Sequence, residues 1–161
     1  MASTQQWSES NGVGQVETLD ISNLNFGAID ASNLNIATYP IIRGESSFIK
    51  YLRVKFGGSY AQISNMKFWK SLGTLKAGET INAAANVAYA TPTASPTADS
   101  SIPTDVGSAL SLQSAEGNAT IEPGSGVSGY TKYVRLQLQT TGSTPVGGVN
   151  QKTFVVQWDE S

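Results

Sequence analysis

Three separate segments alternate apolar and polar residues with a period of two, and this pattern constrains the fold most. They are Phe48–Phe56 (FIKYLRVKF), Tyr133–Gln139 (YVRLQLQ) and Lys152–Trp158 (KTFVVQW). Successive side chains of a strand point to opposite faces of a sheet, so the alternation predicts half-buried antiparallel strands. Their common parity predicts one shared core made of Leu52, Val54, Phe56, Val134, Leu136, Leu138, Phe154, Val156 and Trp158.

A fourth strand is predicted over Ala61–Trp69, where Ile63 is out of phase with Met66 and Phe68. One extra residue near Ser64-Asn65 would restore the phase, which predicts a bulge or a tight turn there. No stretch carries the apolar spacing of a capped helix, and glycine turns are frequent. Weaker strands are expected at Gln15–Leu19, Thr80–Tyr89 and Ala109–Gln113. The expected fold is therefore all-β, an antiparallel β-sandwich or a jelly-roll-like barrel.

The length of 161 residues fits one β-sandwich domain, expected over residues 15–161, preceded by an extended N-terminal arm over 1–14. The arm is polar and contains glycine, and ordering costs about 1–2 kcal/mol per residue, so a partner is expected to hold it. Trp7 has no local core in such an arm, which favours an anchor inserted into a neighbouring subunit.

A long loop rich in Pro, Thr, Ser and Ala is expected over residues 83–105, which include the sequence YATPTASPTADSSIPTD. Its three prolines exclude a central strand. Long loops in compact domains are usually functional or disordered, and contact with another surface is the expectation here. The residues predicted to contact a partner are Trp7 in the arm and Tyr89, Pro92 and Pro96 in this loop.

A short internal echo, SNLNF at 22–26 and SNLNI at 32–36, predicts two similar turns or short strands. The oxygen-rich set in this region could in principle hold Ca²⁺: Asn23, Asn25, Asp30, Asn33 and Asn35. EF-hand spacing is absent, however, and Asx side chains in turns usually bond their own backbone. We therefore expect local turn capping, with no metal and no cofactor.

The chain contains no histidine and no cysteine. This excludes Ser-His-Asp and Cys-His catalysis and disulfides, and it removes the usual zinc ligands. The acidic residues occur mainly in predicted turns or at the tail, and Asp159 and Glu160 are adjacent on a strand, so they point to opposite faces. We expect no enzymatic activity. Among the tryptophans, Trp69 and Trp158 are expected in the core, whereas an exposed aromatic row would indicate a sugar-stacking platform.

Charged residues make up only 14% of the chain, with a net charge of −2 and a pI of about 5.0. An acidic chain without a basic face argues against nucleic-acid binding.

No apolar run approaches the roughly 20 residues that span a bilayer, and the N-terminus lacks the basic and apolar regions of a signal peptide. We expect no membrane association, and either retention in a cytoplasm or release by a route other than secretion. A polar but weakly charged surface also favours a subunit of a larger assembly, because few ions need desolvation.

Several segments, in this order along the chain, resemble small structural proteins of tailed bacteriophages. They are QQWSES, NLNFGAID (23–30), YLRVKFGGSYAQISNMKFWK (51–70), YATPTASP, GYTKYVRLQLQ and FVVQWDES. The resemblance implies an all-β virion protein without catalytic residues, which decorates or cements the capsid or sits at the neck or tail.

The leading expectation is a capsid decoration or cement protein that binds the major capsid protein and copies of itself. The expected location is the virion, assembled in the host cytoplasm. The alternatives are a neck, tail or baseplate subunit and, from a different class, a carbohydrate-binding β-sandwich module.

Overall fold

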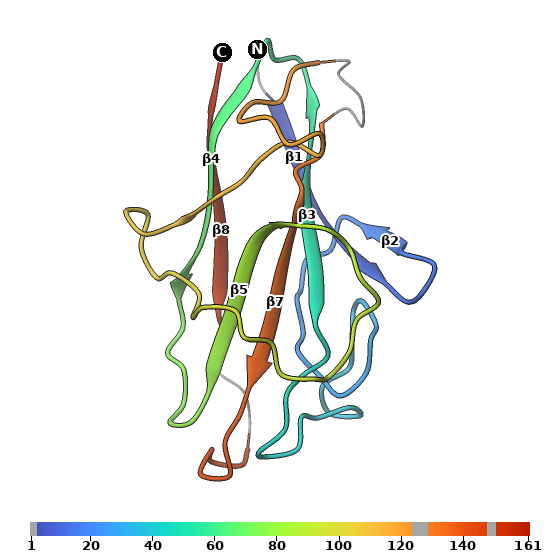
Figure 1. Ribbon diagram of the computed structural model, residues 1–161, viewed down its shortest axis with the longest axis vertical. Coiled ribbons are helices and arrows are strands. Elements are labelled where there is room, and N and C mark those ends of the chain that lie inside the picture. The colour runs from blue at the N-terminus through green and yellow to red at the C-terminus, as the bar shows by residue number, and fades with distance from the viewer. Residues whose placement is uncertain (1–2, 124–128, 148–150) are drawn as a thin grey trace.

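The computed structural model describes residues 3–123, 129–147 and 151–161, and these ranges contain strands and turns but no helix. The prediction of an all-β fold is confirmed. All strand pairs are antiparallel and form two sheets (Figure 1). The first has the order β2 (Val16–Leu19), β1 (Ser3–Asn11), β3 (Lys50–Gly58), β7 (Tyr133–Gln139) and β5 (Thr80–Val87). The second has the order β6 (Leu110–Ser111), β4 (Ile63–Leu72) and β8 (Thr153–Glu160).

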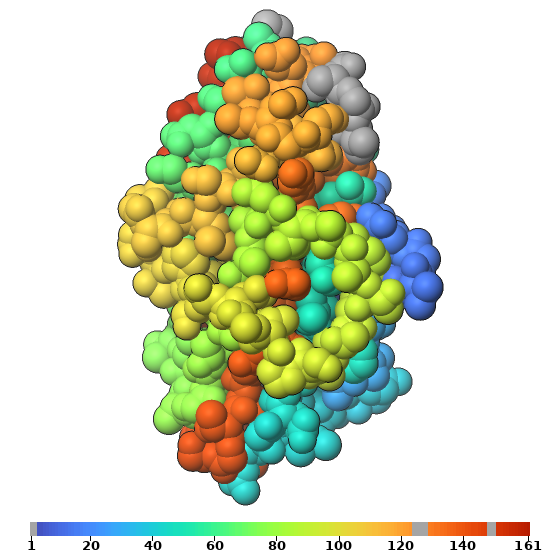
Figure 2. Space-filling model, viewed as in Figure 1, coloured from blue at the N-terminus to red at the C-terminus, as the bar shows by residue number. Residues whose placement is uncertain are grey.

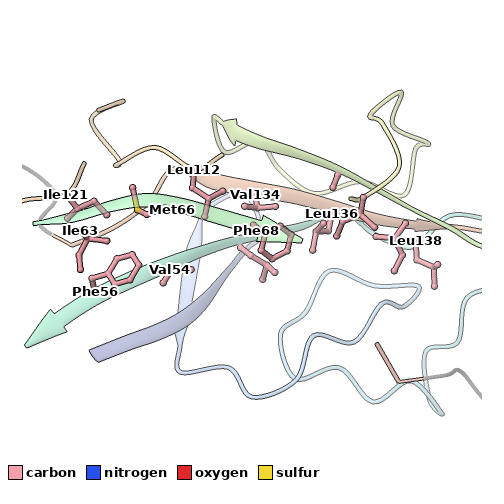
Figure 3. Close-up of a cluster of buried hydrophobic side chains, with 14 of the residues drawn as sticks. Val54, Phe56, Ile63, Met66, Phe68, Leu112, Ile121, Val134, Leu136 and Leu138 are labelled. Atoms are coloured by element: carbon pink, nitrogen blue, oxygen red, sulfur yellow. The ribbon is translucent and has the colours of Figure 1, made fainter. Parts of the chain in front are cut away.

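One hydrophobic core joins the facing sides of the two sheets in a sandwich-like arrangement (Figure 3). The first sheet supplies Leu52, Val54 and Phe56 from β3, Val134, Leu136 and Leu138 from β7, and Ile81 and Ala83 from β5. The second sheet supplies Ile63, Met66 and Phe68 from β4, with Phe154, Val156 and Trp158 of β8 packed against them while half-buried. The core predicted from the common parity of three strands is therefore confirmed.

Strand β4 is irregular at the predicted place. Its register with β8 shifts between Ser64 and Lys67, and Asn65 has a positive φ of 49°. The shift brings Ile63, Met66 and Phe68 all into the core despite their uneven spacing.

The extended arm predicted over 1–14 is wrong for the residues that the structure describes. Ser3–Asn11 is β1, which lies between β2 and β3 and pairs with β3 from Ser3 opposite Gly58 to Ser10 opposite Tyr51. The arm is thus a strand within its own sheet, and the pairing with β3 supplies the order that was expected from a partner. Residues 1–2 lie outside the described ranges.

Much of the segment 88–105 folds back over the outer face of the first sheet (Figure 2), and its last residues run along the edge of β5 towards β4. The expected loop began at residue 83, but residues 83–87 belong to β5. Buried Gln137 of β7 fastens the segment: its Oε1 accepts from the Thr97 amide at 2.8 Å and its Nε2 donates to the Ser95 carbonyl at 3.0 Å. Ser100 and Ile102 add backbone hydrogen bonds with β5.

A second long segment, residues 21–41, contains turns but no strand. Both copies of the internal echo lie in it, and neither forms a strand. Leu24, Phe26 and Ile41 pack against the core, and Phe26 meets Phe154 of β8 edge to face, with centroids 6.4 Å apart. The segment therefore packs against the beginning of β8.

Candidate docking surfaces

Trp7 does not project as an anchor. It is half-buried, packs against the core, and meets Phe68 of β4 edge to face at a centroid distance of 5.8 Å. Because Trp7 lies opposite Val54 in the β1–β3 register, it points inward. In this fold the ring packs within its own core, and its contact with a partner stays a prediction.

The three predicted contact residues of the loop have different surroundings. Tyr89 is half-buried, its ring lies 4.9 Å from that of Tyr51, and its hydroxyl donates to the Gly12 carbonyl. Burial, reinforced by the negative charge of Asp30, raises the pKa of Tyr89 to about 12. Pro92 is buried, whereas Pro96 is exposed. Of the predicted contact residues, only Pro96 lies fully on the surface.

The prediction that Trp69 lies in the core is wrong. It alternates with buried Phe68 along β4 and pairs with Val155, so it is on the outer face of the three-stranded sheet, where it is half-buried. Most other aromatic rings make internal contacts: Trp158 meets Phe56, and Tyr51, Tyr89 and Tyr133 meet one another. These rings do not form the exposed row expected of a sugar-stacking platform.

The β1–β2 hairpin projects from the side of the molecule (Figure 1) and carries exposed aliphatic side chains on both of its faces. Val13 at its tip is 88% exposed, and Val16 and Leu19 of β2 are exposed as well. Charges stabilise the hairpin beneath them: Glu17 and Arg53 form an ion pair at 2.7 Å. Burial acts to raise the pKa of Glu17, but hydrogen bonds from Arg53 and Ser8 outweigh it and lower the pKa. The hairpin thus carries exposed apolar side chains, and the Glu17–Arg53 ion pair holds it to the first sheet.

A second apolar surface surrounds a cleft beside segment 21–41, here called the end cleft. It consists of two hollows of about 460 and 520 Å³ that share Phe26, Ile36 and Leu138 as lining residues. Exposed side chains stand in the segments on its two sides: Ile42 (70% exposed) and Tyr39 on one, Val146 (82% exposed) on the other. Thr140 ties the two sides together, since its hydroxyl accepts from the Gly44 amide at 2.9 Å.

The first hollow is lined by two chain segments, one on each wall. Residues 151–154, at the start of β8, form one wall, and β8 is an edge strand of its sheet. Residues 21–26 form the other. Within the described ranges, the backbone of residues 22–26 makes no hydrogen bond. Edge strands and unpaired backbone are templates for pairing with another chain, and the hollow combines both.

Charged groups at the end cleft are largely engaged with each other. Lys152 and Glu79 form a nearly buried ion pair at 3.3 Å, and each lines one of the two hollows. Arg43 lines the second hollow. The cleft is therefore suited to an apolar or backbone ligand more than to a highly charged one.

Among the Asx residues considered as calcium ligands, Asn35 caps its own turn, whereas Asp30 and Asn25 bond to residues farther away along the chain. Asp30 accepts from the Gly12 amide at 2.7 Å, the Asn25 amide group donates to the Leu34 carbonyl, and the Asn35 oxygen accepts from the Ala37 amide. In the described part of the chain, no three acidic side chains come together in a way that could hold a metal.

Sequence reasoning missed Val13, Val16, Ile42 and Val146, the most exposed members of the two surfaces. A signal was present, because the sequences GVG (12–14), PIIRG (40–44) and PVG (145–147) place aliphatic residues between glycine or proline. Turns normally carry polar residues, so an aliphatic side chain there is not needed for the local fold.

Comparison with models of protein families, with curated proteins and with solved structures yields no match for this chain. In the ranges described, no helix has the length and apolar character needed to cross a membrane.

Proposed function

We propose that this chain is a structural protein of a bacteriophage virion without enzymatic activity, most specifically a capsid decoration or cement protein. It binds the major capsid protein and further copies of itself, and it stabilises the head against heat and internal pressure. The protein assembles onto the particle in the host cytoplasm, needs no cofactor, and contacts neither nucleic acid nor membrane.

The observation that supports this most is the presence of two separate apolar surfaces on one chain. Val13 and Val16 lie on the hairpin, Val146 lines the end cleft, and Ile42 lies next to the lining residue Ile41. Exposed apolar patches on an otherwise polar domain indicate sites of interaction. Two such sites allow one subunit to bridge two neighbours, so that each contact raises the effective concentration of the other.

The end cleft also suggests how a capsid partner is held. An extended segment of the major capsid protein would lie in the first hollow and pair with the free edge of β8. Its side chains would meet Phe26 and Phe154, which line this hollow. Strand addition gives affinity through main-chain hydrogen bonds and specificity through pockets.

The alternatives remain distinguishable. A neck, tail or baseplate subunit would use the same surfaces at a few positions of the particle instead of many. A carbohydrate-binding module has less support, because most aromatic rings pack internally.

We also propose that the sandwich has a jelly-roll-like form. Successive strands from β3 to β8 alternate between the two sheets, which is compatible with it.

The direct test uses particles assembled without this chain. They should form but release their genome at a lower temperature, and adding the purified protein should restore the difference. Equal heat resistance with and without the chain would contradict the cement role. Loss of tail attachment in its absence would favour the neck or tail alternative.

Paired substitutions locate the contacts. Val13→Ser with Val16→Ser, and Ile42→Ser with Val146→Ser, should each weaken binding to such particles about 10–100-fold, because each pair removes roughly 2 kcal/mol of apolar burial. The matched control is Val106→Ser, another exposed valine, which lies outside both surfaces. The control should bind like the wild type, and an equal loss in all three would mean that neither surface is specific.

A further inference from the structure

An ion pair is buried at one end of the sandwich, on the inner face of the first sheet. Lys50 at the start of β3 and Glu9 of β1 are 1% and 0% exposed, and Lys50 Nζ lies 2.7 Å from Glu9 Oε1. Lys50 Nζ also donates to the Ala31 carbonyl at 2.7 Å, which fixes the direction of the amine. A lysine and a glutamate are thus held together away from water.

An asparagine side chain meets the same carboxylate oxygen. Asn11 Nδ2 donates to Glu9 Oε1 at 2.9 Å and to Asp30 Oδ1 at 2.6 Å. The β1–β3 register ends with Ser10 opposite Tyr51, so the next position places Asn11 opposite Lys50. Glu9 Oε1 therefore contacts both the lysine nitrogen and the amide nitrogen, and the carboxamide of Asn11 lies beside the amine of Lys50.

The second oxygen of Glu9 shows that this is not a fully satisfied ion pair. Glu9 Oε2 is buried and has no hydrogen-bond partner in the described part of the chain. A charged carboxylate with an unpartnered oxygen is costly in a protein interior. Movement of one proton from Lys50 to Glu9 along the 2.7 Å contact removes both charges and leaves a neutral amine, which is the nucleophilic form of lysine.

We propose that Lys50 and Asn11 join in an intramolecular isopeptide bond, with Glu9 transferring the protons. Glu9 first takes a proton from Lys50 Nζ. The Nζ lone pair then attacks Asn11 Cγ, and a new C–N bond forms. Glu9 delivers its proton to Nδ2, and the bond between Cγ and Nδ2 breaks. Glu9 then takes the second proton from Nζ and passes it to the departing nitrogen, which leaves as ammonium.

The step balances without an oxidant or cofactor. A protonated amine and a carboxamide give a secondary amide and an ammonium ion, because the two protons that Lys50 loses depart with the Asn11 nitrogen. Glu9 is the catalytic residue, since it touches both reacting groups. Asp30 is a positioning residue that holds the carboxamide through Nδ2.

The bond would join β1 covalently to β3 in a chain that contains no cysteine. It would close the residues from 11 to 50 into a ring and so restrict the unfolded chain, as a disulfide does. The proposal does not depend on the virion role.

The test is the intact mass of the full-length purified chain, measured under denaturing conditions after prolonged incubation of the folded protein. The wild type should be lighter than its sequence by one ammonia. Proteolysis should yield a branched peptide that joins Asn11 to Lys50, with no tryptic cleavage after Lys50. A folded wild type that keeps its full mass would overturn the proposal without any variant.

Variants assign the roles. Asn11→Ala, Lys50→Arg and Glu9→Gln should each retain the full mass, whereas the matched control Asn25→Ala should still lose one ammonia. Loss of water with a branch at Asp30 would overturn the assignment of Asn11 as the acceptor. A Glu9→Gln protein that still crosslinks at the wild-type rate would overturn the role of Glu9.

Discussion

Two long segments lack regular strands, residues 88–105 and residues 21–41. They differ in how far hydrogen bonds hold them to the rest of the molecule. Much of the first lies over the outer face of the first sheet, where Gln137 and the strand β5 fasten it. The second packs against the beginning of β8, leaves the end cleft open, and makes no backbone hydrogen bond over residues 22–26 within the described ranges. The proline-rich segment is thus committed to its own fold, while the asparagine-rich one leaves groups available to a partner.

The largest effect on stability is expected at Gln137, which holds the first segment through hydrogen bonds. Gln137→Leu should lower the free energy of unfolding by about 2–4 kcal/mol, because the Thr97 amide and the Ser47 and Ser95 carbonyls lose their buried partner. Denaturant unfolding measures this. Gln157→Leu, at an exposed position of β8, is the control and should change stability by less than about 0.5 kcal/mol. Equal effects would mean that the segment is not fastened by Gln137.

The second segment should be most sensitive at Gly27. A Cβ there would lie 2.0 Å from a Leu34 methyl and 2.8 Å from the Tyr39 carbonyl oxygen. Gly27→Ala should therefore cost about 1–3 kcal/mol of unfolding free energy through overpacking. Gly142→Ala, where a Cβ meets nothing within 4 Å, is the matched control and should be close to neutral. A neutral Gly27→Ala would show that segment 21–41 is not packed as described.

A smaller, pH-dependent effect is expected at Tyr89 in the first segment. Burial raises its pKa to about 12 in the folded state, above the ordinary value of 10. The folded protein therefore favours the neutral phenol, and this stability is fully present below pH 10 and is lost as the pH rises through about 12. Tyr89→Phe should flatten the fall in stability between pH 10 and 12 in denaturant unfolding. An unchanged fall would indicate that another group, such as Tyr60, dominates.

The smallest effect on stability is expected at Pro96, an exposed residue of the first segment. Pro96→Ala should change the unfolding free energy by no more than about 0.5 kcal/mol. If Pro96 touches a neighbour on the particle, binding should fall at most a few-fold, less than for either apolar surface. A larger loss in a sedimentation assay would move the main contact from the end cleft to the proline-rich segment.

The sequence predicted the strands whose inward residues are apolar. Leu52, Val54 and Phe56 make the alternation of β3 visible, and even the irregularity at Ser64-Asn65 could be inferred from the phase of the core residues. β1 could not be predicted in this way. Its inward positions include Glu9, which pairs with Lys50, so the strand reads as polar although it lies within the sheet.

The candidate site was less predictable than the strands, because the residue pattern of a strand does not show which other segment covers its face of the sheet. Gln137 has the parity of a solvent-facing residue, yet segment 88–105 buries it. For Trp69, the expectation of core packing was wrong, whereas strict alternation with buried Phe68 gives the outer face that the structure shows. Whether a distant loop covers the outer face of a sheet depends on the path of that loop. The alternation of apolar and polar residues within a strand carries no information about this path.

Hydrogen exchange of the chain, free in solution and bound to the particle, tests the contrast between the two segments most directly. In the free chain, the amide of Thr97, which donates to Gln137, and that of Ile102, which donates to the Ile81 carbonyl, should exchange slowly. The amides of residues 22–26 should exchange rapidly and become protected on binding. Protection of residues 22–26 in the free chain, or no change on the particle, would contradict the assignment of the end cleft as the docking site.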